Sequence, residues 1–172
     1  MTAIILGLWI ISACASIQDK EKELSAPELL QKGIKDTKRG YLVEATSAFQ
    51  QVLEDYPDSE ERVKALLLLA RTYYSNEEYE EAKFHFQKFT ELYPAHRQTD
   101  RAYFYKVMSD YKMIDLAQRD QTHTQEALEG FEQLITQFPK SQYLNDARIK
   151  KQECETILAK NIFEIGKFYF RT

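Results

Sequence analysis

One spacing of alanine, phenylalanine and proline recurs three times along this chain and limits the possible folds more than any other feature. In each copy a phenylalanine follows the alanine by four residues, and a proline follows the phenylalanine by eight. The copies are Ala45, Phe49 and Pro57; Ala82, Phe86 and Pro94; and Ala127, Phe131 and Pro139. Residues four apart share one face of a helix, and proline ends a helix because it has no backbone N–H. The spacing predicts a repeated helix that packs through one face and stops at a proline.

A small residue stands twelve positions before the alanine in the first two copies, Gly33 before Ala45 and Ala70 before Ala82. Small residues let two helices approach closely, so each unit is expected to be a helical pair. This pattern resembles the tetratricopeptide repeat, a helical pair of about 34 residues. The resemblance implies an all-α fold, a right-handed superhelix of about three and a half helical hairpins. The repeats are expected near residues 26–57, 59–94 and 99–139, with an incomplete one at 141–172.

The third repeat is longer than the others. Its counterpart of the small residue, Val107, precedes Ala127 by twenty residues rather than twelve, which places eight extra residues between the paired helices, around 113–124. A fourth unit is expected near Gly166 and Tyr169. These two residues are three apart, as Ala70 and Tyr73 are in the second repeat. The second helix of that unit is missing.

Composition excludes several classes of protein. The chain has 172 residues, of which 44% are hydrophobic, and only 5 glycines and 4 prolines, which favours a globular helical fold. Acidic residues (27) outnumber basic ones (23), and the basic ones are scattered, so no nucleic-acid partner is expected. The 3 histidines have no metal-ligand spacing, and no catalytic motif is present. We therefore expect no metal, no cofactor and no enzymatic activity.

The amino terminus resembles the export signal of bacterial lipoproteins. Residues 3–11 are uncharged and almost wholly apolar, and an aliphatic residue and two small residues precede Cys14. The resemblance implies a signal peptide at 1–13, acyl chains on Cys14, a lipidated flexible spacer at 14–24 and a repeat domain at 25–172. Because Ala15 rather than Asp follows the cysteine, the outer membrane is the implied destination. The alternative is an apolar start that ends in a buried cysteine by chance.

The tetratricopeptide resemblance also implies a binding surface. In that family the outward side of each first helix lines a concave groove. The corresponding residues are Leu30, Ile34, Thr37, Leu67, Arg71, Tyr74, Phe104, Met108 and Tyr111. An apolar and aromatic strip with one cation suits an extended peptide with bulky side chains, and Arg71 could meet a carboxylate. The alternative is that these side chains pack against neighbouring repeats or the flanking terminal segment.

The lipoprotein signal, the spacer and the long repeats together resemble the BamD (ComL) family of the outer-membrane β-barrel assembly machine. Residues 131–147 carry the most specific part of the resemblance, with Phe138, Pro139, Ser141, Gln142 and Tyr143. The family implies a lipid-anchored scaffold on the periplasmic face of the outer membrane. Its implied partners are a BamA-like barrel protein, other assembly-machine lipoproteins and unfolded outer-membrane proteins with aromatic-rich terminal signals.

Other functions remain open. A secretin pilotin or an envelope division or Tol-associated lipoprotein would show the same repeats, and an envelope hydrolase would need a cluster of catalytic groups. Members of the BamD family usually have five repeats, so we expect that the reading frame is truncated or the sequence incomplete. The apolar end of the chain, residues 162–170, would then expose a face that needs a cover.

Overall fold

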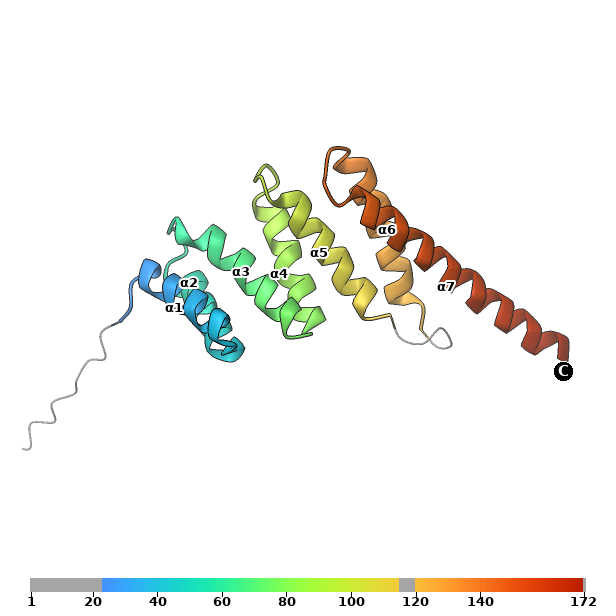
Figure 1. Ribbon diagram of the computed structural model, residues 1–172, viewed down its shortest axis with the longest axis horizontal. Helices are drawn as coiled ribbons and strands as arrows, with labels where there is room; N and C mark the ends of the chain where they lie inside the picture. Colours follow the sequence, from blue (N-terminus) through green and yellow to red (C-terminus); the bar gives the residue numbers. More distant parts are fainter. Residues whose placement is uncertain (1–22, 115–119, 172) are drawn as a thin grey trace, which may run out of the picture.

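The computed structural model describes residues 23–114 and 120–171, which form seven α-helices and no strand (Figure 1). The expected signal peptide and Cys14 lie outside these residues. The helices are α1 (Ala26–Arg39), α2 (Leu42–Asp55), α3 (Glu61–Ser75), α4 (Tyr79–Leu92), α5 (Thr99–Lys112), α6 (Thr122–Gln137) and α7 (Leu144–Arg171). They follow one another in chain order along the long axis of the molecule. The all-α tetratricopeptide-type fold is confirmed.

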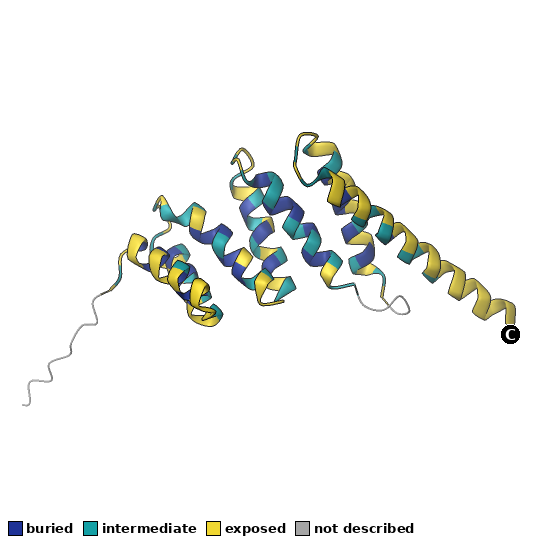
Figure 2. Cartoon of the chain, viewed as in Figure 1, coloured by how far each residue is buried: buried dark blue, intermediate teal, exposed yellow. Residues whose placement is uncertain are grey.

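Each helix packs against the next, and α1 also contacts α3. The buried side chains form three clusters, one around α1, α2 and the start of α3, one between α3, α4 and α5, and one between α5, α6 and α7. A row of small clusters in place of one central core is the arrangement of a repeat protein, in which each unit contacts only its neighbours. Figure 2 shows the buried positions running along the stack.

The repeated alanines and phenylalanines form the centre of each hairpin and are fully buried. The ring of Phe49 lies so close to Gly33 that a Cβ added there would be 2.5 Å from it. In the third repeat the small residue stands on the opposite helix, because a Cβ added to Gly130 of α6 would be 2.6 Å from Val107 of α5. The close helix approach is thus kept although the small residue has changed sides.

Residues at its two ends determine where α1 begins and ends. The backbone N–H and hydroxyl of Ser25 both donate to the Glu28 carboxylate, at 2.9 and 2.7 Å. At the other end Gly40 adopts a left-handed conformation with φ of 81°, which ends the helix without strain. The Tyr56 hydroxyl donates to the carbonyl of Leu24 at 2.8 Å and holds the entering chain against the end of α2.

The extra length of the third repeat lies between α5 and α6, where the sequence places it. Residues 115–119 within it are outside the described part of the chain. The insertion ends earlier than expected, because α6 begins at Thr122 and Thr124 is buried in its first turn.

The fourth unit begins with α7, inside the expected range 141–172, but not in the register given by Gly166. The buried Ala147 follows Pro139 by eight residues, as Ala65 follows Pro57 and Ala102 follows Pro94, so α7 opens as a first helix. Gly166 lies twenty-two residues into α7, and a Cβ added there would have no neighbour within 4 Å. It is therefore no counterpart of the packed Ala70. The spacing of Gly166 and Tyr169 therefore equals that of Ala70 and Tyr73 by chance.

The last turns of α7 are apolar and exposed (Figure 2). Six large side chains there are between 52 and 95% exposed: Ile162, Phe163, Ile165, Phe168, Tyr169 and Phe170. Although α7 has 28 residues, neither it nor any other helix of the described residues is long and apolar enough to cross a membrane.

Candidate functional site

The nine residues expected to line the groove, called here the first-helix strip, lie on α1, α3 and α5. Three of them are buried, with Leu30 and Leu67 6% exposed and Phe104 7% exposed. They pack into the three core clusters, so for these three the packing alternative applies. The other six reach the surface in part or in full: Ile34, Thr37, Arg71, Tyr74, Met108 and Tyr111.

Aromatic side chains link the first helices of successive repeats. The rings of Tyr74 and Tyr105 meet edge to face with centroids 5.1 Å apart, and Tyr105 meets Tyr143 in the same way at 6.2 Å. Tyr143 also stacks on Phe104 at 4.5 Å. Burial, with smaller contributions from neighbouring tyrosines, raises the pKa of Tyr74 to about 12, so this hydroxyl stays neutral at physiological pH.

The sequence did not indicate that Tyr105 or Tyr143 lies beside the first-helix strip, although Tyr143 belongs to the run that carries the family resemblance. Tyr74 follows the preceding proline by seventeen residues, Tyr105 by eleven and Tyr143 by four. The three tyrosines therefore run obliquely across the first helices and share no position in the repeat. Because a repeat comparison finds only residues at equal positions, no spacing in the sequence marks this row.

A cleft of about 460 Å³ lies between α3 and the turn that leads into α5. One wall is apolar and comes from Val63, Leu67 and Leu68. The remaining lining residues are polar or charged: Glu60, Lys64, Arg71, His96, Arg97 and Gln98. The cleft thus contains Leu67 and Arg71 of the first-helix strip, and it adds basic residues that the repeat pattern did not single out.

The imidazole of His96 is held in place at the edge of this cleft. Its Nδ1 accepts a hydrogen bond from the backbone N–H of Gln98 at 3.2 Å, and its ring meets Phe89 edge to face at 5.3 Å. By contrast, the side chains of Lys64, Arg71 and Arg97 have no ion pair or hydrogen bond with any described residue. The cleft therefore presents cations that are free to bind a ligand.

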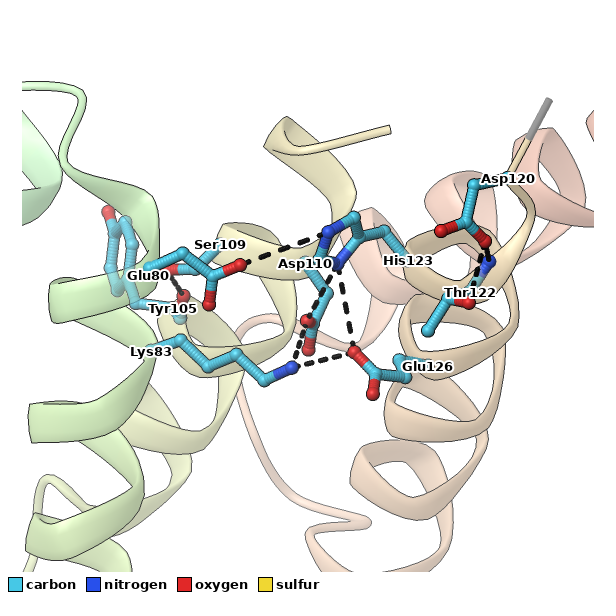
Figure 3. A network of polar contacts seen from close by, with 9 residues as sticks. All are labelled: Glu80, Lys83, Tyr105, Ser109, Asp110, Asp120, Thr122, His123 and Glu126. Carbon is cyan, nitrogen blue, oxygen red and sulfur yellow. Dashed lines mark hydrogen bonds and ion pairs between the residues drawn. The ribbon is translucent and has the colours of Figure 1, made fainter. Parts of the chain in front are cut away.

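A second polar cluster joins α4, α5 and α6 (Figure 3). The Lys83 ammonium lies 2.5 Å from Asp110 Oδ1 and 2.6 Å from Glu126 Oε2. Asp110 is only 3% exposed, and burial raises the pKa of its carboxyl above the ordinary value. Burial alone would lower the pKa of Lys83, but its hydrogen bonds to the two carboxylates raise it. The ammonium therefore stays charged and ties the three helices together.

His123 extends this cluster toward the solvent. Its Nδ1 lies 3.8 Å from Asp110 and 3.7 Å from Glu126, and its Nε2 lies 3.9 Å from Glu80 (Figure 3). The nearest ligand atoms of Asp110, His123 and Glu126 are within 4.8 Å of one another, close enough to hold a metal ion. However, the Lys83 ammonium already lies between the two carboxylates, 2.5 Å from Asp110 and 2.6 Å from Glu126. We interpret the cluster as a structural tie between helices.

Comparison with known proteins places the chain in a family. Residues 22–172 match the family model YfiO, described as an outer membrane lipoprotein. The outer membrane protein assembly factor BamD of Rickettsia prowazekii is 29% identical over 170 residues, covering 98% of this chain and 67% of that protein. Its counterpart in Caulobacter vibrioides is 29% identical over 133 residues, covering 77% and 44%. The chain thus spans about half to two thirds of the length of these relatives.

Solved structures agree on the fold. The first tetratricopeptide domain of Spaghetti (RPAP3), bound to an HSP90 peptide, superposes with a TM-score of 0.57 at 18% identity, covering 78% of this chain and 93% of that one. MamA from Desulfovibrio magneticus gives 0.56 at 16% identity, covering 86% and 77%. These likenesses show the tetratricopeptide fold alone. The family match over residues 22–172, which include the whole repeat domain, shows that the chain belongs to the YfiO family of outer membrane lipoproteins.

Proposed function

We propose that this protein is a non-catalytic scaffold of the outer-membrane β-barrel assembly machinery. The observation that carries the proposal is the YfiO family match over residues 22–172. It is supported by relatives named outer membrane protein assembly factor BamD. In this proposal the chain binds a BamA-like barrel protein and other assembly-machine lipoproteins, and it receives unfolded barrel proteins before their insertion.

The exposed part of the first-helix strip suits the binding of unfolded barrel proteins. Tyr74, Met108 and Tyr111 are half-buried, so each offers an aromatic or apolar surface from a fixed position. Aromatic groups held in this way bind bulky side chains of an extended peptide with little loss of conformational entropy. A surface spread over several hairpins would engage several residues of one peptide at once.

The proposed location is supported by the lipoprotein-like signal at the amino terminus. Acyl chains on Cys14 would anchor the protein to the periplasmic face of the outer membrane, and residues 15–24 would space the repeats from the bilayer. A single acyl chain gives only marginal binding, at about 0.8 kcal/mol for each buried methylene, whereas several chains on one cysteine anchor stably. The lipid is the only non-protein group that the proposal requires.

The test is recovery of partners from the native membrane. The full-length protein, with its own signal, is extracted in mild detergent and captured, and the bound proteins are identified by mass spectrometry. We expect a BamA-like barrel protein. Recovery of a secretin or of division and Tol proteins without a BamA-like protein would overturn the proposal in favour of a pilotin or a division factor. A Cys14→Ser variant expressed at the same level separates partners bound by protein contacts from proteins that only share the membrane.

A further inference from the structure

We infer that the last turns of α7, residues 159–171, lie in the interface of an anionic phospholipid bilayer and form a second membrane contact beside the lipid on Cys14. These residues are called here the distal segment. The inference rests on the proposed membrane location of the chain and is independent of the proposed protein partners. It assigns a phospholipid surface to an apolar region that the described residues leave exposed.

The distal segment extends beyond the stack of repeats (Figure 1). The first half of α7 packs against α6 and buries Ala147 and Cys154 in the core cluster shared with α5 and α6. From Ile162 to Arg171 every residue is exposed, as Figure 2 shows at the end of α7. A bilayer can therefore contact this part of α7 without displacing any packed helix.

The charged residues of the distal segment lie along one side of the helix. Each follows the previous one by three or four residues, which places them in a single stripe. They are Lys160, Glu164, Lys167 and Arg171. Three basic residues and one acidic residue give the stripe a net charge of +2, whereas the whole chain has −4. A cationic stripe beside apolar residues favours binding to anionic phospholipids.

The apolar side chains of the distal segment cover more than one face of the helix. Ile165 follows the buried Cys154 by eleven residues, about three helical turns, so it continues the face that packs against α6. Phe163 precedes Ile165 by two residues and lies on the opposite side, where Phe170 follows two turns later. A helix of a second copy would cover one of these faces and leave the other exposed. A bilayer interface surrounds a helix on all sides but its polar stripe, so this distribution favours a lipid surface.

The types of side chain agree with an interfacial position. Four of the six large apolar side chains are aromatic: Phe163, Phe168, Tyr169 and Phe170. Tyrosine is enriched where the bilayer meets water, and phenylalanine is typical of the apolar face of helices that lie there. The stems of Lys and Arg can follow the apolar surface while their charged groups stay in water.

The proposed lipid on Cys14 makes such a contact effective. Stable anchoring takes more than one weak signal, and a short interfacial helix alone binds reversibly. Acyl chains on Cys14 keep the whole chain near the bilayer, which raises the effective concentration of the distal segment at its surface. We therefore expect the contact to form in the lipidated protein and to be lost together with the anchor.

The test is tryptophan fluorescence of the lipidated protein in vesicles of phosphatidylethanolamine and phosphatidylglycerol. The only tryptophan, Trp9, lies in the expected signal peptide, so Phe170→Trp places a single reporter in the mature chain. We expect this reporter to lose emission when the vesicles contain phospholipids brominated on their acyl chains. The matched control is Phe84→Trp on α4, which replaces another exposed phenylalanine and should keep its emission. If the reporter at position 170 is quenched no more than the control, the inference is wrong.

Two further variants, made in the Phe170→Trp protein, separate the apolar and the charged contributions. Phe163→Gln with Ile165→Gln changes exposed residues only, so α7 should stay folded by circular dichroism while the quenching disappears. Lys167→Gln with Arg171→Gln should lower the bound-to-free ratio of the distal segment at least about tenfold, because each basic residue near an anionic surface contributes about fivefold.

The matched control for charge is Lys38→Gln with Arg39→Gln, which removes two basic residues from the exposed last turn of α1 and should leave the quenching unchanged. Full quenching in Lys167→Gln with Arg171→Gln would overturn the assignment to an anionic lipid surface. A second copy on the distal segment would give a different result. The reporter would then resist brominated lipid and shift to shorter wavelength as the protein-to-lipid ratio rises, and the inference would be wrong.

The two proposals fail separately. If a BamA-like protein is recovered from the membrane but brominated lipid does not quench the reporter, only the membrane contact of α7 is wrong. If the reporter is quenched and no BamA-like protein is recovered, the membrane contact stands and the assembly function is wrong.

Discussion

At the residue scale, the contact between Gly33 and Phe49 shows how little room a repeat leaves between its two helices. A Cβ at residue 33 would be 2.5 Å from the ring, which no real packing permits, and the ring is fully buried and cannot leave. Gly166 is the opposite case, since it is also in a helix but faces open space. The two glycines therefore form a matched pair for experiment.

We expect Gly33→Ala to lower the free energy of unfolding by about 1–3 kcal/mol, because overpacking outweighs the higher helix propensity of alanine. Gly166→Ala should leave stability unchanged or raise it by up to about 1 kcal/mol. Urea unfolding followed by circular dichroism measures both. Equal effects from the two substitutions would show that the close contact does not limit the packing.

His85 makes stability depend on pH. Its ring stacks on Tyr73 at 5.4 Å, and burial, with a smaller contribution from Lys88, lowers its pKa from 6.5 to about 4. The unfolded chain therefore takes up a proton at a higher pH than the folded one, so this contribution to stability is complete above pH 6.5 and is lost as pH falls toward 4. The loss is on the order of 2–3 kcal/mol.

In the variant His85→Gln this part of the pH dependence should disappear. The measurement is the urea midpoint at several pH values between 7 and 4, in both proteins. If both proteins lose stability in parallel over that range, another group carries the effect.

At the scale of the helices, the Lys83 cluster holds the second and third repeats together. The ammonium on α4 reaches carboxylates on α5 and α6, so one side chain connects three helices. Removing it leaves the buried Asp110 carboxylate without its cation, and a buried charge that loses its partner is costly.

We expect Lys83→Met to lower the free energy of unfolding by about 2 kcal/mol, somewhat less than for a fully buried pair because Lys83 is partly exposed. The double variant Lys83→Met with Asp110→Leu should recover most of this loss, because no buried charge is left unpaired and the Glu126 carboxylate is 45% exposed to solvent. Thermal unfolding of the single and double variants gives the comparison. A double variant no more stable than the single one would mean that the cost comes from lost packing of the lysine side chain.

At the scale of the whole molecule, the proposed lipid anchor on Cys14 would set the position of the repeats relative to the membrane. We expect Cys14→Ser to move the protein from the membrane fraction to the soluble periplasmic fraction, because the proposed acyl chains supply the anchor. Cell fractionation followed by immunoblotting measures the distribution. The matched control is Cys154→Ser, which changes the other cysteine, a buried residue of α7, and should leave the protein at the membrane. Membrane retention of the Cys14 variant would contradict lipid anchoring.

Much of the architecture could be read from local periodicity. The spacing of Ala45, Phe49 and Pro57 and its two later copies locates α2, α4 and α6, because helix faces and helix ends depend on residues near in the chain. The register of the fourth unit could not be read from Gly166, since small residues are common and only their neighbours decide whether they are packed. The eight-residue step from proline to Ala65, Ala102 and Ala147 is the signal that locates it.

The sequence by itself determined the class of fold and the residues that form the hairpin centres. Only the tertiary structure decided which strip residues are buried, because the exposure of Leu30, Leu67 and Phe104 depends on helices from other repeats. It also brought Arg71 of α3 to one cleft with Arg97 of the turn before α5. Periodicity orders residues along one helix, whereas a binding site is formed by the packing of several, and that packing depends on the whole chain.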